Sequence, residues 1–296
     1  MARIGGFHLQ AAVVASLFLA ACGGGGEFIA PTGQINLGVT DAPVDGATHV
    51  VVRFTGVEVK PSGGPAVTTT FSAPRDIDLL ALQGGGSTLI LQGVTLPAGS
   101  YEYVRLMVNA GRDASDSYID LDDGTRHALF IPSGNESGLK LHNGFSVTAD
   151  RLTNFTVDFN LRSSVHQPNG GDGIYILRPT LRIVENDASG TIAGTVSTAT
   201  ATAAGCTPAV YLYAGSDAVT GDEGGSHPPL VTAAVSLNSA SGNYEYTAAF
   251  LPLGAYTAAF TCNAAADDPD TADSAVMFFN ATNVTVTAEQ ISTVNF

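Results

Sequence analysis

Residues 155–161 read FTVDFNL and alternate between apolar and polar side chains at every step. Successive side chains of a β-strand point to opposite faces, so this segment has one apolar and one polar face. The apolar face carries Phe155, Val157, Phe159 and Leu161, and the polar face carries Thr156, Asp158 and Asn160. The pattern predicts a strand that packs one face on a hydrophobic core, and it points to an all-β fold.

Similar short runs recur from residue 35 to residue 184, separated by Gly, Pro and Asp turns, which is typical of antiparallel sheets. Residues 48–60 read THVVVRFTGVEVK, and their apolar set changes sides at Gly56. A β-bulge at Thr55 and Gly56 would restore the register. Arginines such as Arg162 and Arg182 stand at polar strand positions, and we expect a solvated or salt-bridged sheet face with acids such as Asp158 as partners. An anion site is the alternative.

The charge distribution indicates a second domain. Residues 27–187 contain 18 acidic and 11 basic residues, whereas residues 188–296 contain 9 acidic residues and no Lys or Arg. New strands begin with GTIAGTV at 190–196, and LPLGAY at 251–256 echoes LPAGSY at 96–101. We expect two tandem antiparallel β-sandwiches, Ig-like or transthyretin-like, with a domain at 33–187 and an acidic C-terminal domain at 188–296.

The start of the chain indicates export. Residues 1–21 carry Arg3, then a short apolar stretch and small residues, which is the layout of a cleaved signal peptide. The tetrad LAAC at 19–22 resembles the bacterial lipobox, which implies a lipid on Cys22 and a Gly-rich tether over residues 22–32. An ordinary secretory signal with an incidental cysteine is the alternative. Glycine at position 23 favours the outer membrane over retention at the inner membrane.

The other two cysteines are Cys206 and Cys262, an even pair in an oxidising compartment, and we expect them to form a disulfide. The formal net charge of −15 argues against nucleic acid as a partner, because phosphate contacts need Lys and Arg.

One loop has the composition of a cation site. Residues 265–273 read AADDPDTAD and place four carboxylates close together, on Asp267, Asp268, Asp270 and Asp273. Oxygen ligands on a flexible loop suit Ca²⁺, so calcium is a candidate cofactor. The alternative is a plain acidic loop.

Catalytic motifs give little support to an enzyme. The run SGLK at 137–140 fits S-x-x-K, but that chemistry needs the serine to open a helix, and here the motif enters a β-run. The sequence contains no Walker loop, dinucleotide fingerprint or H-E-x-x-H motif. We therefore expect no enzymatic activity.

Six blocks of the first domain carry a family resemblance, and they occur in this order: VTDAPVDGATHVVVRFTGVEV, DIDLLAL, LPAGSYEYVRLMV, IPSGNESGLKL, VDFNLRSSV and YILRPTLRIV. Together they make residues 33–184 similar to the domain of unknown function 4382 family of bacterial lipoproteins. The resemblance implies an exported β-sandwich and supplies no catalytic residues. The C-terminal part more distantly resembles transthyretin-like or carboxypeptidase-regulatory sandwiches, a fold that overlaps with carbohydrate-binding modules.

These observations favour a lipid-anchored protein of the cell envelope that acts as a binding, adhesion or assembly module. Its expected partners are the membrane, through the lipid, and envelope proteins or polysaccharide. A calcium- or carbohydrate-binding C-terminal sandwich is the alternative, and an enzyme of unrecognised type is the least expected.

Overall fold

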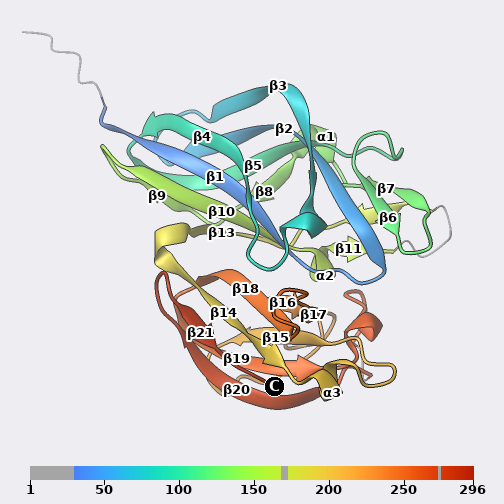
Figure 1. Cartoon of the computed structure of the whole chain (residues 1–296). Coiled ribbons are helices and arrows are strands. Elements are labelled where there is room, and N and C mark those ends of the chain that lie inside the picture. The colour runs from blue at the N-terminus through green and yellow to red at the C-terminus, as the bar shows by residue number, and fades with distance from the viewer. Residues whose placement is uncertain (1–29, 168–172, 273–274) are drawn as a thin grey trace, which may run out of the picture. The chain divides into compact units, whose positions relative to one another are not determined.

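The computed structural model describes residues 30–167, 173–272 and 275–296, and it shows an all-β protein (Figure 1). Residues 31–296 form one compact unit. The signal segment and Cys22 lie outside the described residues, so the lipid anchor stays a prediction. Within the described part, no helix is long and apolar enough to cross a membrane.

The first sandwich contains a mixed sheet in which two strands distant in sequence lie side by side. Strands β1 and β10 run parallel, with Gln34 opposite Leu152. The sheet order is β13, β10, β1, β4, with bounds β1 (Thr32–Ala42), β4 (Thr88–Pro97), β10 (Leu152–Asn160) and β13 (Leu181–Glu185).

The facing sheet is built around the long strand β2. The pairing of β2 with β3 and with β5 shifts register between Phe54 and Gly56, which confirms the bulge predicted there. Added at Gly56, a Cβ would come within 2.7 Å of the Thr69 carbonyl oxygen, so only glycine fits without a shift. The strands are β2 (Ala47–Pro61), β3 (Val67–Asp78), β5 (Gly99–Asn109), β6 (Tyr118–Leu121), β7 (Arg126–Phe130), β8 (Leu139–Leu141), β9 (Phe145–Val147), β11 (Val165–His166) and β12 (Tyr175–Leu177).

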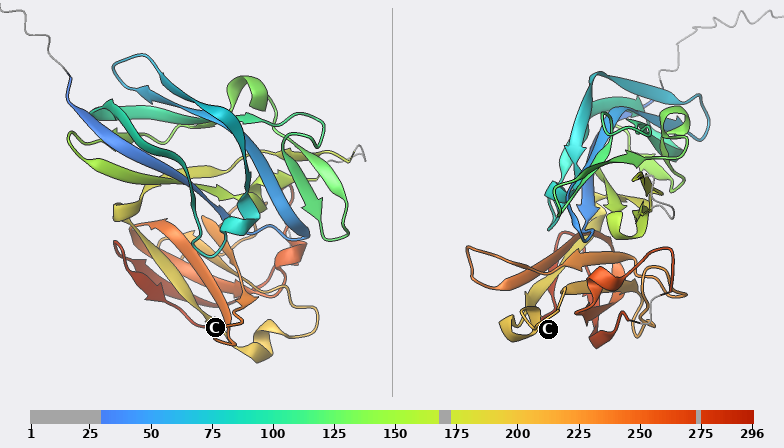
Figure 2. Two further views of the ribbon diagram at one scale, coloured as in Figure 1. Left: turned by 45° about the horizontal axis from the view of Figure 1, so that its top comes forward. Right: turned by 90° about the vertical axis from the view of Figure 1, so that its right-hand side faces the viewer.

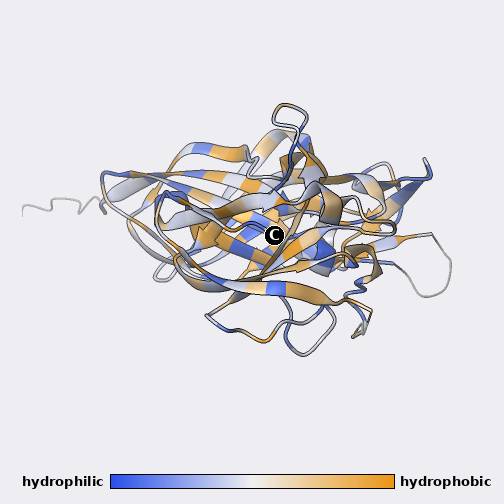
Figure 3. Ribbon diagram, turned by 60° about the horizontal axis from the view of Figure 1, so that its bottom comes forward, coloured by the Kyte–Doolittle hydropathy of each residue, from blue (hydrophilic) through white to orange (hydrophobic). Residues whose placement is uncertain are grey.

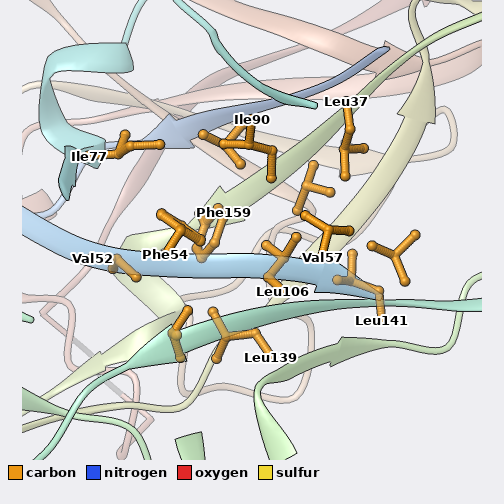
Figure 4. Packing of buried hydrophobic residues seen from close by; sticks show 14 of the residues in the cluster. Leu37, Val52, Phe54, Val57, Ile77, Ile90, Leu106, Leu139, Leu141 and Phe159 are labelled. Atoms are coloured by element: carbon orange, nitrogen blue, oxygen red, sulfur yellow. The ribbon is translucent and has the colours of Figure 1, made fainter. Parts of the chain in front are cut away.

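Apolar side chains from both sheets meet in one core (Figure 4). Phe54 of β2 and Phe159 of β10 are fully buried and meet edge to face, with ring centroids 6.3 Å apart. Burial of such a side chain stabilises the fold by roughly 1.5–3 kcal/mol. The apolar face of β10 therefore packs in the hydrophobic core, as the alternation of its sequence predicts.

The polar face of β10 is buried as well, so it is salt-bridged rather than solvated. Thr156, Asp158 and Asn160 are each less than 7% exposed. Asp158 lies opposite Arg182 of β13, with Oδ2 and Nη2 2.6 Å apart. A buried polar group needs a partner, and neighbouring parts of the chain supply it here.

The second sandwich has two four-stranded sheets, and its strands gather apart from those of the first in both views of Figure 2. One sheet holds β14 (Ser189–Val196), β17 (Ser236–Leu237), β18 (Tyr244–Pro252) and β21 (Ile291–Thr293). The other holds β15 (Ala209–Ala214), β16 (Val231–Ala234), β19 (Gly254–Thr261) and β20 (Phe278–Val286). Its hydrophobic clusters are separate from the first core. The assignment of two domains at 33–187 and 188–296 stays a prediction.

The two LPxGxY segments have the same local structure. The Tyr101 hydroxyl donates to the Pro97 carbonyl and the Tyr256 hydroxyl donates to the Pro252 carbonyl, both at 2.8 Å. The turn glycine between them has a positive φ in each case, which glycine adopts without steric cost. Each sandwich thus closes one strand-to-strand turn with a tyrosine that reaches back four residues.

Helices in the described part are single turns, and hydrophobic and hydrophilic residues alternate along many strands (Figure 3). The helical segments are η1 (Leu79–Leu82), α1 (Gly134–Ser137), α2 (Leu161–Ser164), η2 (Asn186–Ala188), α3 (Thr198–Ala201) and η3 (Ala264–Ala266).

Candidate functional site

A disulfide lies directly before residues 265–273, which we call the acidic loop. It joins Cys206, just before β15, to Cys262, just after β19, and these two strands are hydrogen-bonded neighbours. The Thr207 N–H donates to the Cys262 carbonyl at 2.8 Å, and η3 follows. The disulfide therefore holds the first end of the acidic loop against the sheet.

Carboxylates of the acidic loop turn to different partners in the protein. Asp267 accepts hydrogen bonds from the Tyr211 hydroxyl at 2.6 Å and from the Glu223 N–H at 3.0 Å. Burial raises the pKa of Asp267. Asp270 lies 3.0 Å from His166 Nδ1, and Asp268 accepts from the Asp270 N–H at 2.9 Å.

These contacts bear on the calcium prediction. Residues 30–167, 173–272 and 275–296 contain no group of three or more Asp, Glu, His or Cys side chains arranged to hold a metal ion. Asp273, the fourth carboxylate of the predicted site, lies outside the described residues. Calcium binding by the loop therefore stays a prediction.

Beside the loop lies a buried arginine from the first sandwich. Arg162 of α2 is 3% exposed, and its Nη1 donates to the Ala264 carbonyl at 2.7 Å and pairs with the Asp45 carboxylate. Its Nε has no hydrogen-bond partner among the described residues. The Asp45 side chain is 38% exposed, so the buried guanidinium is paired with a carboxylate at the protein surface.

Glu223 approaches the same segment from the loop between β15 and β16. It is 8% exposed and accepts hydrogen bonds from the Ser163 hydroxyl at 2.7 Å and from Asn160 Nδ2 at 3.3 Å. Burial raises the pKa of Glu223 to about 7, although both hydrogen bonds favour the charged form. A titratable carboxyl therefore sits where β10, α2 and the acidic loop meet.

Next to these residues lies a cleft of about 510 Å³. Its wall combines hydrogen-bonding groups with an aromatic ring and includes Asp45, Arg162, Gln167, Tyr175, Asp268 and Asp270. Small-molecule sites in proteins have volumes of roughly 300–1,000 Å³ and combine apolar surface with a few placed polar groups. The cleft is therefore the candidate functional site of the described residues.

Sequence reasoning found the acidic side of this site and missed the other. It placed Arg162 at a polar strand position on a solvated or salt-bridged face. The strand position is wrong because the residue lies in the short helix α2 and is buried, although it does form an ion pair, with Asp45. It did not single out Glu223, which stands in the turn-like run GDEGG at 221–225. No local signal distinguishes that glutamate from one in an ordinary surface turn.

The S-x-x-K motif does not have the geometry that acyl transfer requires. Ser137 ends α1 rather than opening a helix, and Lys140 lies on strand β8. The Lys140 ammonium stacks on the Tyr103 ring, with Nζ 3.7 Å from its centroid. Serine and lysine are therefore not one helical turn apart.

The protein is a two-sandwich β-protein whose chain belongs to the family described as Domain of unknown function (DUF4382), which matches residues 32–179. This agrees with the resemblance of residues 33–184. No curated protein matches the chain.

Similarity to solved structures is low. A leucine-rich repeat protein from Bacteroides thetaiotaomicron VPI-5482 is 14% identical with a TM-score of 0.21, over 90% of this chain and 26% of that chain. The TIE protein of Bacillus anthracis is 13% identical with a TM-score of 0.18, over 90% of this chain and 34% of that chain. This chain therefore spans only about a quarter of the length of the leucine-rich repeat protein and about a third of the length of the TIE protein. GBS52, the minor pilin of Streptococcus agalactiae, is 10% identical with a TM-score of 0.19, over 88% of this chain and 94% of that chain. Such TM-scores carry no argument about function.

Proposed function

We propose that this protein is a lipid-anchored protein of the bacterial cell envelope that acts as a non-catalytic binding, adhesion or assembly module. The anchor is a lipid on Cys22, in the outer membrane, with the folded part at the periplasmic or cell-surface face. Two domains, residues 33–187 and 188–296, follow the tether. Their separate hydrophobic clusters support this division.

The observation that carries the binding role is the cleft beside Arg162. It is built from the turn after β1, from α2 and from the acidic loop, which are distant in sequence. The Asp45–Arg162 ion pair and the Arg162–Ala264 hydrogen bond fix its wall. A wall preorganised in this way lowers the ordering cost of binding a ligand.

Replacement of Cys22 tests the anchor. Cys22→Ala, or globomycin treatment of wild-type cells, should leave unprocessed or soluble protein in place of a membrane-bound form. As a control, the double variant Cys206→Ser with Cys262→Ser also loses cysteines but should stay in the membrane fraction. Membrane fractionation and lipid labelling that are unchanged in Cys22→Ala would rule out the anchor.

Polysaccharide is the ligand class that the cleft favours. Carboxylates and Gln167 offer acceptors to sugar hydroxyls, the Gln167 amide offers a donor, and the partly exposed Tyr175 ring offers an apolar face. This combination of groups suits a ring that is polar at its edge and apolar on its face.

A glycan array probed with the soluble Cys22→Ala protein tests this ligand class. Tyr175→Ala should lower any affinity found by at least about tenfold, the equivalent of 1.4 kcal/mol. Tyr103→Ala is the matched control, because Tyr103 is also partly exposed but lies on β5 and does not line the cleft. Equal losses in both variants, or no bound glycan, would exclude polysaccharide binding by this cleft.

A further inference from the structure

One end of the first sandwich gathers the start of the folded chain and two turns. The Ala98 N–H donates to the Pro31 carbonyl at 2.7 Å, and the Ser62 N–H donates to the Ser100 carbonyl at 2.9 Å. These bonds join the first described residues to the β4–β5 turn, and that turn to the β2–β3 hairpin. We call residues 31–32, 61–67 and 97–101 the proline tip.

The proline tip carries an apolar groove of about 530 Å³. Its lining includes Pro61, Pro65, Val67, Pro97, Ala98 and Tyr101. No residue of the tip is charged, and its exposed members are small or proline: Pro31, Thr32, Ser62, Gly63, Pro65, Ala66, Pro97, Gly99 and Ser100.

The charged residues next to the tip in sequence, Lys60 and Glu102, lie close to each other as an ion pair. Lys60 Nζ donates to the Pro61 carbonyl at 2.9 Å and lies 3.8 Å from a carboxylate oxygen of Glu102. The tip therefore presents little net charge, in a protein whose formal net charge is −15.

The length of chain before Pro31 limits what can lie near the tip. Only residues 23–30 separate Cys22 from Pro31. A fully extended chain of this length reaches about 30 Å. A Gly-rich coil of the same length has a root-mean-square span of roughly 16 Å. If Cys22 carries the lipid of the proposed function, the bilayer surface stays within this distance of the groove.

We propose that the proline tip is the surface with which the anchored protein rests on the phospholipid bilayer. This inference rests on the proposed lipid anchor and adds an orientation to it. Anionic lipids repel acidic surfaces, and residues 188–296 carry 9 acidic residues without any Lys or Arg. The tip itself is uncharged and nearest the tether, and the nearest charges beyond it include the oppositely charged pair of neighbours Asp150 and Arg151, so it can approach the membrane at little electrostatic cost.

The orientation places the candidate cleft away from the membrane. Strand β1 starts at the tip with Thr32 and ends at Ala42, shortly before Asp45 of the cleft. Ten residue steps of a strand span about 33 Å. The cleft would thus open toward the space beyond the bilayer, where an envelope ligand can reach it.

Two exposed loop serines at opposite ends of β5 allow a direct test. Ser62 lies in the tip, and Ser115 follows the far end of β5, again about 33 Å away along the strand. Full-length Ser62→Cys and Ser115→Cys proteins are isolated in native membranes and labelled with a thiol-reactive NBD dye. The membranes are then fused with vesicles of phosphatidylethanolamine and nitroxide-labelled phosphatidylcholine, and lipid-dependent quenching is measured.

We expect several-fold stronger quenching at position 62 than at position 115. A second substitution, Ser100→Asp, places a carboxylate on the exposed rim of the groove and should reduce quenching at position 62 without unfolding the sandwich. Equal quenching at both positions in membrane-bound protein would overturn the orientation. Recovery of both proteins in the soluble fraction would instead reject the anchor, so the two failures are distinguishable.

Discussion

Replacement of Glu223 by glutamine tests the role of its buried carboxyl. We call the region where β10, α2 and the acidic loop meet the junction. Burial raises the pKa of Glu223 from 4.5 to about 7. The folded protein therefore binds a proton at Glu223 that the unfolded chain releases between these two pH values. The free energy of unfolding must fall as pH rises through this window. At 1.36 kcal/mol per pKa unit, the loss is about 3 kcal/mol above pH 7.

Glutamine has the same shape and cannot ionise. Its amide oxygen can accept from Asn160 Nδ2, and its amide N–H can donate to the Ser163 hydroxyl. Glu223→Gln should therefore exceed the wild type by less than about 1 kcal/mol at pH 5 and by about 3 kcal/mol at pH 8. Urea denaturation of both proteins across this pH range measures the difference.

Glu245→Gln is the control for this experiment. Hydrogen bonds from Ser241 and Asn238 lower the pKa of Glu245, and its carboxylate is exposed. The control variant should thus gain no stability at pH 8. The reasoning about Glu223 fails if Glu223→Gln is destabilised by the same amount at pH 5 and pH 8, because the carboxyl would then have the same charge at both.

Three further predictions concern stability. The double variant Cys206→Ser with Cys262→Ser opens a loop whose ends are 56 residues apart in sequence, and it should lose about 4 kcal/mol. Dithiothreitol should cause a similar loss in the wild type and none in the variant. Arg162→Met should cost about 2 kcal/mol in urea denaturation, because the buried hydrogen bond from the guanidinium to the Ala264 carbonyl is lost. Tyr101→Phe and Tyr256→Phe should each cost about 1 kcal/mol by calorimetry, and unequal losses would contradict a shared motif.

The strand pattern of the first sandwich was predictable because burial of one face imposes a period of two. In residues 155–161 the apolar set marks the core face, and Phe159 is fully buried there. The change of sides at Gly56 reveals the bulge for the same reason, since an extra residue shifts every later side chain to the other face. Local sequence carries both signals completely.

The junction could not be predicted in the same way. Alternation shows which face of β10 is polar, but it does not show whether water or protein covers that face. Asn160 meets Glu223, which lies 63 residues further along the chain. Arg162 lies two residues after the last residue of β10 and continues its alternation, yet the chain turns into α2 and buries the guanidinium. Contacts between distant segments decide these positions, and no local pattern encodes them.

Mass spectrometry of the N-terminal tryptic peptide tests the central claim, the lipid anchor, most directly. Arg53 is the first basic residue after Arg3, so the mature protein should yield a peptide that starts at Cys22 and ends at Arg53. Its mass should exceed that of the unmodified peptide by a diacylglyceryl group and an added acyl chain. A peptide that starts at residue 4, or one with a free Cys22 thiol, would contradict the account.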